Sequence, residues 1–244
     1  MPVLGRRRYV ARKAEGPGDV AAAQALRGAA FGLTGADRDR FDAQCTHILI
    51  EDRREARLVG CFRLLDLAGP HVDRGYAAQF YDLSRLASAP GLMTELGRFC
   101  IHPAARDPDI LRTAWGAIAA HVDAQGTRVL FGCTSFRGTD PAPHRAAFAA
   151  LAAWHLAPPE WAPGRRAART VPLEATPHDP RKARAGMPPL LRSYLDMGGR
   201  TSDHAVVDPA MNTIHVFTAL EIAAISETRK ARLRAALDGV PAAR

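Results

Sequence analysis

The distribution of apolar residues along the first half of the chain predicts short strands and one amphipathic helix. Short segments rich in β-branched, leucine and aromatic side chains are typical of β-strands. Four segments have this character: 7–13, 46–51, 58–65 and 93–102. Residues 19–31 instead repeat apolar side chains at helical spacing behind Asp19, a good N-terminal cap, and therefore predict a helix. The charged turn between the second and third segments predicts an antiparallel hairpin.

The second half of the chain continues this alternation of helices and strands. Apolar residues recur at helical spacing in its longer segments, while its shorter apolar segments are typical of strands. Such an order predicts an α/β fold in which helices flank a sheet. The predicted elements are helices at 109–125, 143–156, 190–197 and 219–237 and strands at 128–133 and 213–217.

Two regions lack a periodic pattern. Residues 66–90 are irregular, and their aromatic side chains are expected to anchor them. Residues 157–189 are rich in proline and predict a long surface excursion, and long loops in compact domains are usually functional or mobile. We expect one domain over 1–218 that contains this excursion, followed by a basic amphipathic helix and tail over 219–244. The aromatic residues of the first region are Tyr76, Phe80 and Tyr81.

The composition is that of an ordinary globular protein. Apolar residues make up 47% and charged residues 24% of the 244 positions. No apolar run is long enough to cross a bilayer, and none follows the basic N-terminus as a secretory signal requires. We therefore expect a cytoplasmic protein, with peripheral contact at the inner face of the cytoplasmic membrane left open. The cysteine spacing fits neither a zinc site nor a redox pair and predicts buried, reduced thiols at Cys45, Cys61, Cys100 and Cys133.

The net charge of +8 is concentrated in three segments. These are 1–13, 164–184 and 226–244, so the basic excess lies in the tails and in the proline-rich excursion. An acidic carrier protein or an anionic membrane surface would fit this distribution, and added solubility explains any single segment. Nucleic acid is disfavoured, because the basic segments lack interleaved aromatic residues and known binding motifs.

Glu95 is the main candidate for catalytic chemistry. It lies within an apolar strand, where burial is expected to raise its pKa toward neutrality and to suit it to accept a proton. Arg98 would face the opposite side of a regular strand, but Gly97 predicts a bulge that turns both side chains toward one cleft. The alternative is a solvated ion pair on an edge strand.

A second group of charged residues surrounds the predicted hairpin. Arg63 lies inside an apolar strand, so it must find a partner or line a cleft. Asp39 and Asp42 follow Arg27 in the segment DRDRFD, for which a solvated turn is the ordinary explanation. Each signal is weak alone, and their order along the chain is more informative.

That order resembles a known family. The pattern is similar to the autoinducer-synthase-like branch of the GNAT acyltransferases, and the chain looks most like the ornithine N-acyltransferases that form lyso-ornithine lipid. The resemblance covers about residues 8–218 and also rests on the strings ELGRFCIHP, LFGCTSFRGTDP, MPPLLRSYLDMGG and DPAMNT. The matching features are Arg27 with Phe31, Asp39 with Asp42, GCFRLL at 60–65 and ELGRF at 95–99.

The resemblance implies a fold, a reaction and a set of residues. The fold is GNAT-like, with a mixed central sheet. The reaction transfers a 3-hydroxyacyl chain from acyl carrier protein to the α-amino group of L-ornithine, without a metal or other cofactor. Glu95 and Arg98 take the catalytic positions. The residues implied to bind the substrates are Arg27, Phe31, Asp39, Asp42, Arg63, Phe99 and Ser135.

The loop after the ELGRF strand departs from the pattern of acetyl-CoA-dependent GNAT proteins. Those proteins place a glycine-rich loop there, and its amides hold the pyrophosphate at a helix N-terminus. Here the loop reads HPAARDPDIL, without glycine and with Asp107 and Asp109 at the helix start. We therefore expect a phosphopantetheine arm on a carrier protein in place of coenzyme A.

Two other functions stay open. An acyl-homoserine lactone synthase shares the charged pattern, although Leu33 and Thr34 stand where that family usually has tryptophan. The second is a GNAT-fold protein without catalytic activity that binds a carrier protein or a membrane. Such a protein would be more stable with an apolar residue in place of a buried glutamate, so the presence of Glu95 argues against it. The closing helix either lies on a membrane or packs on the core. The candidate partner residues of the excursion are Arg165, Arg166, Arg169, Arg181, Lys182 and Arg184.

Overall fold

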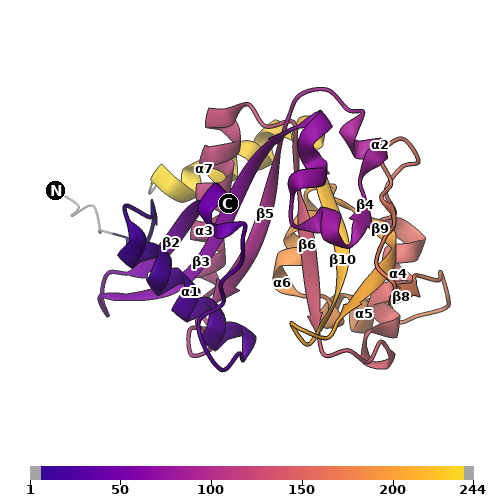
Figure 1. The fold of residues 1–244 in the computed structure, drawn as a ribbon, viewed down its shortest axis with the longest axis horizontal. Helices are drawn as coiled ribbons and strands as arrows, with labels where there is room; N and C mark the ends of the chain where they lie inside the picture. The colour runs from indigo at the N-terminus through magenta and orange to yellow at the C-terminus, as the bar shows by residue number, and fades with distance from the viewer. Residues whose placement is uncertain (1–6, 239–244) are drawn as a thin grey trace. The chain divides into compact units, whose positions relative to one another are not determined.

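The computed structural model describes residues 7–238, which form two compact units (Figure 1). The first unit consists of the described residues within Met1–Leu65, Leu96–Gln125 and Glu227–Arg244. The second consists of Asp66–Glu95 and Gly126–Ser226. Two strands, β3 (Arg57–Ala68) and β5 (Leu92–Ile101), run from one unit into the other. Each unit is described separately below.

The first unit is a small sheet with helices packed on it. Its strands follow the order β1-β2-β3-β5, and β1 and β3 both pair antiparallel with β2. Residues 53–56 connect β2 to β3, so the predicted hairpin is confirmed. The further elements of this unit are β1 (Tyr9–Lys13), β2 (Thr46–Asp52), α1 (Pro17–Phe31), α3 (Pro108–Gln125), α7 (Glu227–Asp238) and the 3₁₀ turn Asp42–Gln44.

Helix α1 ends at Phe31 as predicted, but it begins at Pro17, and Gly16 rather than the predicted Asp19 is its N-terminal cap. Pro17 occupies the first turn, where its missing N–H is not needed, and Asp19 places a carboxylate near the positive end of the helix. Gly32 ends the helix in the left-handed conformation, with a φ of 72° that glycine adopts without steric cost. The buried face of α1, including Ala23 and Leu26, packs against apolar side chains of the sheet.

The second unit contains the strand order β6-β10-β9-β8, and each neighbouring pair is antiparallel. Strands β4 and β7 form a separate two-stranded sheet. Its strands are β4 (Tyr81–Asp82), β6 (Val129–Arg137), β7 (Gly164–Arg165), β8 (Thr170–Pro172), β9 (Arg200–Asp208) and β10 (Thr213–Glu221). Its helices are α2 (Ser84–Ala87), α4 (Arg145–Trp154), α5 (Pro180–Gly186) and α6 (Pro189–Asp196), with 3₁₀ turns at Gly69–Arg74, Ala77–Gln79, Ala142–His144 and Ile222–Ala224.

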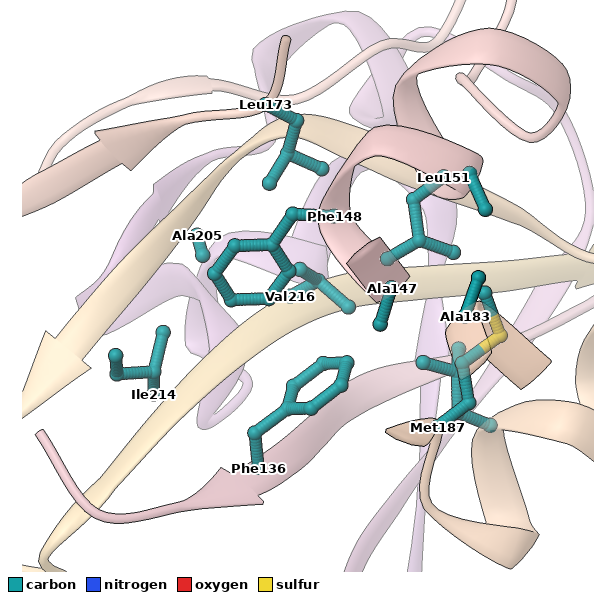
Figure 2. Close-up of a cluster of buried hydrophobic side chains, with 12 residues drawn as sticks. Phe136, Ala147, Phe148, Leu151, Leu173, Ala183, Met187, Ala205, Ile214 and Val216 are labelled. Carbon is teal, nitrogen blue, oxygen red and sulfur yellow. The ribbon is translucent and has the colours of Figure 1, made fainter. Parts of the chain in front are cut away.

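The core of the second unit lies between helices α4 and α5 and one face of the sheet (Figure 2). Phe136 from β6 meets Phe148 from α4 edge to face, with ring centroids 5.1 Å apart. Ile214 and Val216 contribute the same face of β10. Because side chains alternate along a strand, His215, which lies between Ile214 and Val216, points to the opposite face of the sheet.

The main differences from the predicted elements lie after residue 157. The excursion contains β8 and α5, and strand β9 was not predicted. Strand β10 continues to Glu221 because it pairs with β6 over its whole length, so the closing helix begins only at Glu227. The predicted boundary at residue 218 therefore falls inside a strand. The other predicted helices and strands are confirmed with shifted ends.

Helix α7 contacts α3 within the first unit. Arg234 of α7 holds Asp123 of α3 with two hydrogen bonds of 2.7 and 3.2 Å. This contact favours packing on the core over the membrane alternative for the described part of the helix, while the side chain of Leu237 lies outside that part. Across residues 7–238, no helix has the length and apolar character needed to cross a membrane.

Candidate active site

Glu95 is buried and is held by the backbone of the irregular region before β5. Glu95 is only 4% exposed. One carboxylate oxygen accepts a hydrogen bond from the Tyr76 N–H at 2.7 Å, and the other accepts one from the Ala77 N–H at 2.6 Å. These amides open the 3₁₀ turn Ala77–Gln79, so the carboxylate also caps that turn.

The chain passes very close to this carboxylate at Gly75. A Cβ atom at that position would lie 2.7 Å from Oε2 of Glu95, so glycine permits the approach. The two N–H donors fix the orientation of the carboxylate and stabilise its negative charge. Since burial favours the neutral form and the amides favour the charged form, the protonation state expected for Glu95 stays a prediction.

The backbone of β5 is irregular directly after Gly97, as the sequence predicted. Arg98 has a φ of 52°, a left-handed conformation that is uncommon for residues other than glycine. Its guanidinium group contacts Asp37 at 2.8 Å and Asp39 at 3.1 Å. The ion pairs hold Arg98 in this conformation. That the irregularity turns Glu95 and Arg98 toward one cleft stays a prediction.

Arg63 is buried inside β3 and is paired, as its position required. Nη1 lies 2.6 Å from Asp39 and 2.6 Å from Asp42, and Nη2 lies 2.7 Å from the second oxygen of Asp39. The contact with Asp39 is therefore bidentate, an arrangement that a guanidinium group is shaped to make.

Arg27 completes the same network from helix α1. The residue is 1% exposed, and its guanidinium group makes two hydrogen bonds to Asp42 at 2.7 and 2.9 Å. Its Nε atom lies 2.8 Å from Asp37. Three arginines and three aspartates thus balance each other within the first unit. We refer to Arg27, Arg63, Arg98, Asp37, Asp39 and Asp42 as the arginine–aspartate network.

The network keeps its aspartates ionised. Burial alone would raise the pKa of Asp39, but the hydrogen bond and charge of Arg63 outweigh it and leave that pKa below its usual value. Burial of Asp42 is outweighed in the same way by Arg27 and Arg63, and the pKa of Asp42 is lowered further. These aspartates lie in a buried salt-bridge network where a solvated turn was the ordinary expectation.

The network adds one residue that the sequence reasoning did not select. Asp37 is 6% exposed and joins Arg27 to Arg98. Its signal was present in DRDRFD, whose first residue shares the segment with Asp39 and Asp42. Because all three carboxylates already contact guanidinium groups, a role in holding the first unit together is favoured by the geometry, and the expected role in binding a substrate stays a prediction.

The other residues that the sequence predicted to bind substrate make contacts of a different kind. Phe31 is half-buried and packs against the core of the first unit. Phe99 stacks on Phe62 with ring centroids 5.8 Å apart. Ser135 is exposed on β6, where it stands opposite His215 in the register of the two strands. Their expected roles in substrate binding stay predictions.

A cluster of aromatic and histidine rings in the second unit, buried except for the half-buried Phe80, was not predicted. We refer to Phe80, Tyr81, His204, His215 and Phe217 as the aromatic–histidine cluster. Phe80 meets the edge of His215 with centroids 4.8 Å apart, and Tyr81 lies 5.2 Å from His204 and 5.7 Å from Phe217. The irregular region supplies Phe80 and Tyr81, which the sequence expected as anchors. The polar residues within TIHVF and DHAVV were its other signal.

The start of helix α3 is occupied by a side chain of the chain itself. Asp107 accepts a hydrogen bond from the Asp109 N–H at 2.9 Å and one from the Tyr9 hydroxyl at 3.0 Å. The backbone hydrogen bond is the largest factor that lowers the pKa of Asp107. A carboxylate of the chain therefore occupies the helix start, where the helix dipole would otherwise favour a bound anion.

Comparisons with known proteins identify the family of the chain. Residues 23–116 match the acetyltransferase (GNAT) domain family. The L-ornithine N(alpha)-acyltransferase of Rhodobacter capsulatus is 34% identical over 242 residues, which cover 91% of this chain and 93% of that protein. The enzyme of the same name from Brucella abortus is 35% identical over 203 residues, which cover 78% of this chain and 72% of that protein.

A solved structure shows the same fold at lower identity. FeeM, an N-acyl amino acid synthase from uncultured soil microbes, is 12% identical and has a TM-score of 0.53. The similarity covers 88% of this chain and 93% of FeeM. The expected α/β GNAT-like fold, a mixed sheet flanked by helices, is confirmed. With two such relatives covered over most of their length, the chain belongs to the L-ornithine N(alpha)-acyltransferase family of GNAT enzymes and is an acyltransferase.

Proposed function

We propose that the protein transfers a 3-hydroxyacyl chain from acyl carrier protein to the α-amino group of L-ornithine, forming lyso-ornithine lipid. The observation that carries this proposal is the buried, amide-bound carboxylate of Glu95 in a chain whose relatives are named L-ornithine N(alpha)-acyltransferase. The relatives favour this function over the acyl-homoserine lactone alternative, and membership of an enzyme family weighs against a non-catalytic shell.

The chemistry requires a proton acceptor and no metal or further cofactor. Glu95, directly or through a water molecule, takes a proton from the ammonium group of ornithine. The free amine then attacks the thioester carbonyl, the new C–N bond forms, and the C–S bond breaks. The attacking nitrogen loses its second proton to solvent, and the pantetheine sulfur takes up the proton that Glu95 accepted and leaves as a thiol. The fixed orientation of the carboxylate supports this role because a base must be held within hydrogen-bond reach of its proton.

Two features support a carrier protein as the donor. Asp107 places negative charge at the helix start where coenzyme A phosphates would otherwise bind. The excursion exposes Arg165, Arg169, Arg181 and Lys182, and carrier proteins are acidic. Electrostatic attraction between these surfaces would speed encounter and weaken at high salt.

A lipid product gives the protein a reason to contact a membrane. Trp154, at the end of α4, is 68% exposed, and Leu156 beside it is 36% exposed. Arg200, also exposed, donates a hydrogen bond to the Trp154 carbonyl. Tryptophan and arginine side by side suit the interface between lipid head groups and acyl chains. Peripheral membrane contact at this corner is therefore the second part of the proposal.

The test uses the purified 244-residue chain. The protein is incubated with a 3-hydroxyacyl chain on carrier protein or on coenzyme A, together with ornithine, lysine or glutamine, and products are measured by mass spectrometry. We expect acylated ornithine from the carrier-bound donor and much less product from the coenzyme A donor. Preference for lysine or glutamine would contradict ornithine as the acceptor. Preference for the coenzyme A thioester would contradict acyl carrier protein as the donor.

A further inference from the structure

His215 presents an unused hydrogen-bond acceptor inside the aromatic–histidine cluster. The residue is 2% exposed. The Tyr81 hydroxyl donates its single hydrogen to the His215 carbonyl oxygen at 2.9 Å. The same hydroxyl oxygen lies 3.2 Å from Nδ1 of His215, and with the hydroxyl hydrogen directed at the carbonyl we assign the ring hydrogen to Nδ1, which donates it. The neutral ring must then keep a lone pair on Nε2.

That lone pair has no protein partner. Nε2 of His215 is buried and makes no hydrogen bond to any residue within 7–238. Burial, followed by the charge of His204, lowers the pKa of His215 to about 4, so the ring is neutral near pH 7. A buried acceptor without a donor costs stability unless a bound molecule or solvent satisfies it.

The position of His215 connects it to the candidate base. The N–H of Tyr76 holds Glu95, and the ring of Tyr76 lies 5.4 Å from the ring of Phe80. Phe80 in turn meets the edge of His215. Ser135, opposite His215 on the neighbouring strand, is exposed, so this face of the sheet reaches solvent at the same register position.

The residues around His215 determine which kind of hydrogen-bond donor Nε2 could accept from. Phe80 and Tyr81 pack against the His215 ring, Phe217 packs against Tyr81, and none of the three carries a negative charge. An ammonium group would lose its hydration there without gaining a carboxylate partner. A hydroxyl group on an otherwise apolar chain loses little, because its single O–H can donate to Nε2 while the chain contacts the aromatic rings.

We propose that Nε2 of His215 accepts a hydrogen bond from the hydroxyl group of the donor's acyl chain and thereby makes the enzyme select hydroxylated chains. The inference rests on the proposed function, since it needs an acyl donor. It assigns His215 a role in specificity and leaves proton transfer to Glu95.

The test compares two donors that differ only in the hydroxyl group. The wild-type chain and the variants His215→Leu and His215→Gln are assayed for kcat/KM with 3-hydroxyacyl and unsubstituted acyl carrier protein of equal chain length. We expect wild type to prefer the hydroxylated donor by about tenfold or more, the scale of a buried acceptor left unsatisfied. His215→Leu should bring the ratio near one mainly by losing rate with the hydroxylated donor, and His215→Gln, which keeps an acceptor oxygen, should retain part of the preference.

Other outcomes overturn the proposal in distinguishable ways. Equal rates with both donors in wild type, or an unchanged ratio in a folded His215→Leu variant, would remove His215 from specificity. If wild type transfers neither chain to any amino acid, the proposed function itself fails. A second readout is the nitrogen NMR spectrum of histidine-labelled protein, in which a 3-hydroxyacyl pantetheine, but not its unsubstituted analogue, should shift Nε2 of His215.

Discussion

Replacing Glu95 with glutamine tests the candidate base and the loop that holds it. In the native chain both carboxylate oxygens accept a backbone N–H, at 2.6 and 2.7 Å. In Glu95→Gln one of these N–H groups must face the NH₂ group of the amide, so one buried donor loses its partner. Such a loss costs about 2 kcal/mol. For a chain of this size that corresponds to a decrease in Tm of about 4–8 °C.

The assay measures folding and turnover separately. Thermal unfolding gives the decrease in Tm, and kcat/KM is measured well below it. Loss of a general base is expected to lower turnover by about 10²-fold or more. The residual activity of Glu95→Gln should rise with pH, because only the free amine reacts without a base. Gly75→Ala is the matched control, since its Cβ disturbs the same loop but keeps the carboxyl group.

Three results would refute parts of this reasoning. Full turnover in a destabilised Glu95→Gln variant would leave Glu95 a structural role only. An unchanged Tm would contradict the importance of the two amide contacts. Equal losses of turnover in Glu95→Gln and Gly75→Ala, with the same pH dependence, would show that loop geometry accounts for the effect.

Three further predictions concern the network and the excursion. Asp42→Ala leaves Arg27 and Arg63 short of a buried partner and should lower the free energy of unfolding in urea by about 3–5 kcal/mol. The control Asp123→Ala breaks an exposed ion pair and should lower it by at most about 1 kcal/mol. Similar losses in both variants would contradict the distinction between buried and exposed pairs. Folding lowers the pKa values of Asp39 and Asp42 below 3.8, so these carboxylates contribute their full stability above that pH and lose it as the pH falls below it. Urea unfolding should therefore give a lower free energy of unfolding at about pH 3 than at about pH 6. The decrease should be smaller in Asp42→Asn. Charge reversal at 181–182 should raise KM for acyl carrier protein at low salt without changing kcat, while reversal at 53–54, also exposed and basic, should not; equal effects would remove the excursion from docking.

The sequence predicted those features that depend on neighbours along the chain. Glu95 was expected to be buried because apolar residues flank it in its strand, and the irregularity after Gly97 followed from glycine in the middle of that strand. Helix α1 was expected from its apolar spacing, and Gly32 ends it in the left-handed conformation. In these places local propensity and the final structure agree.

Features that depend on distant partners were not predictable in this way. The amides that bind Glu95 come from a region without any periodic pattern. Strand β9 contains the buried polar residues Ser202 and His204, which break the alternation expected of a strand, and its pairing with β10 stabilises it. The arginine–aspartate network was visible only as separate weak signals, because its partners lie up to 61 positions apart, as in the contact of Arg98 with Asp37.

The most direct test of the proposed reaction is the position of the acyl group in the product. Ornithine labelled with ¹⁵N at the α-amino group is incubated with wild-type protein and a 3-hydroxyacyl carrier protein, and the product is fragmented in a mass spectrometer. We predict that the acyl-bearing fragment retains the label as an amide. A label found only in the free amine, or no acylated ornithine at all, would contradict α-N-acylation by this protein.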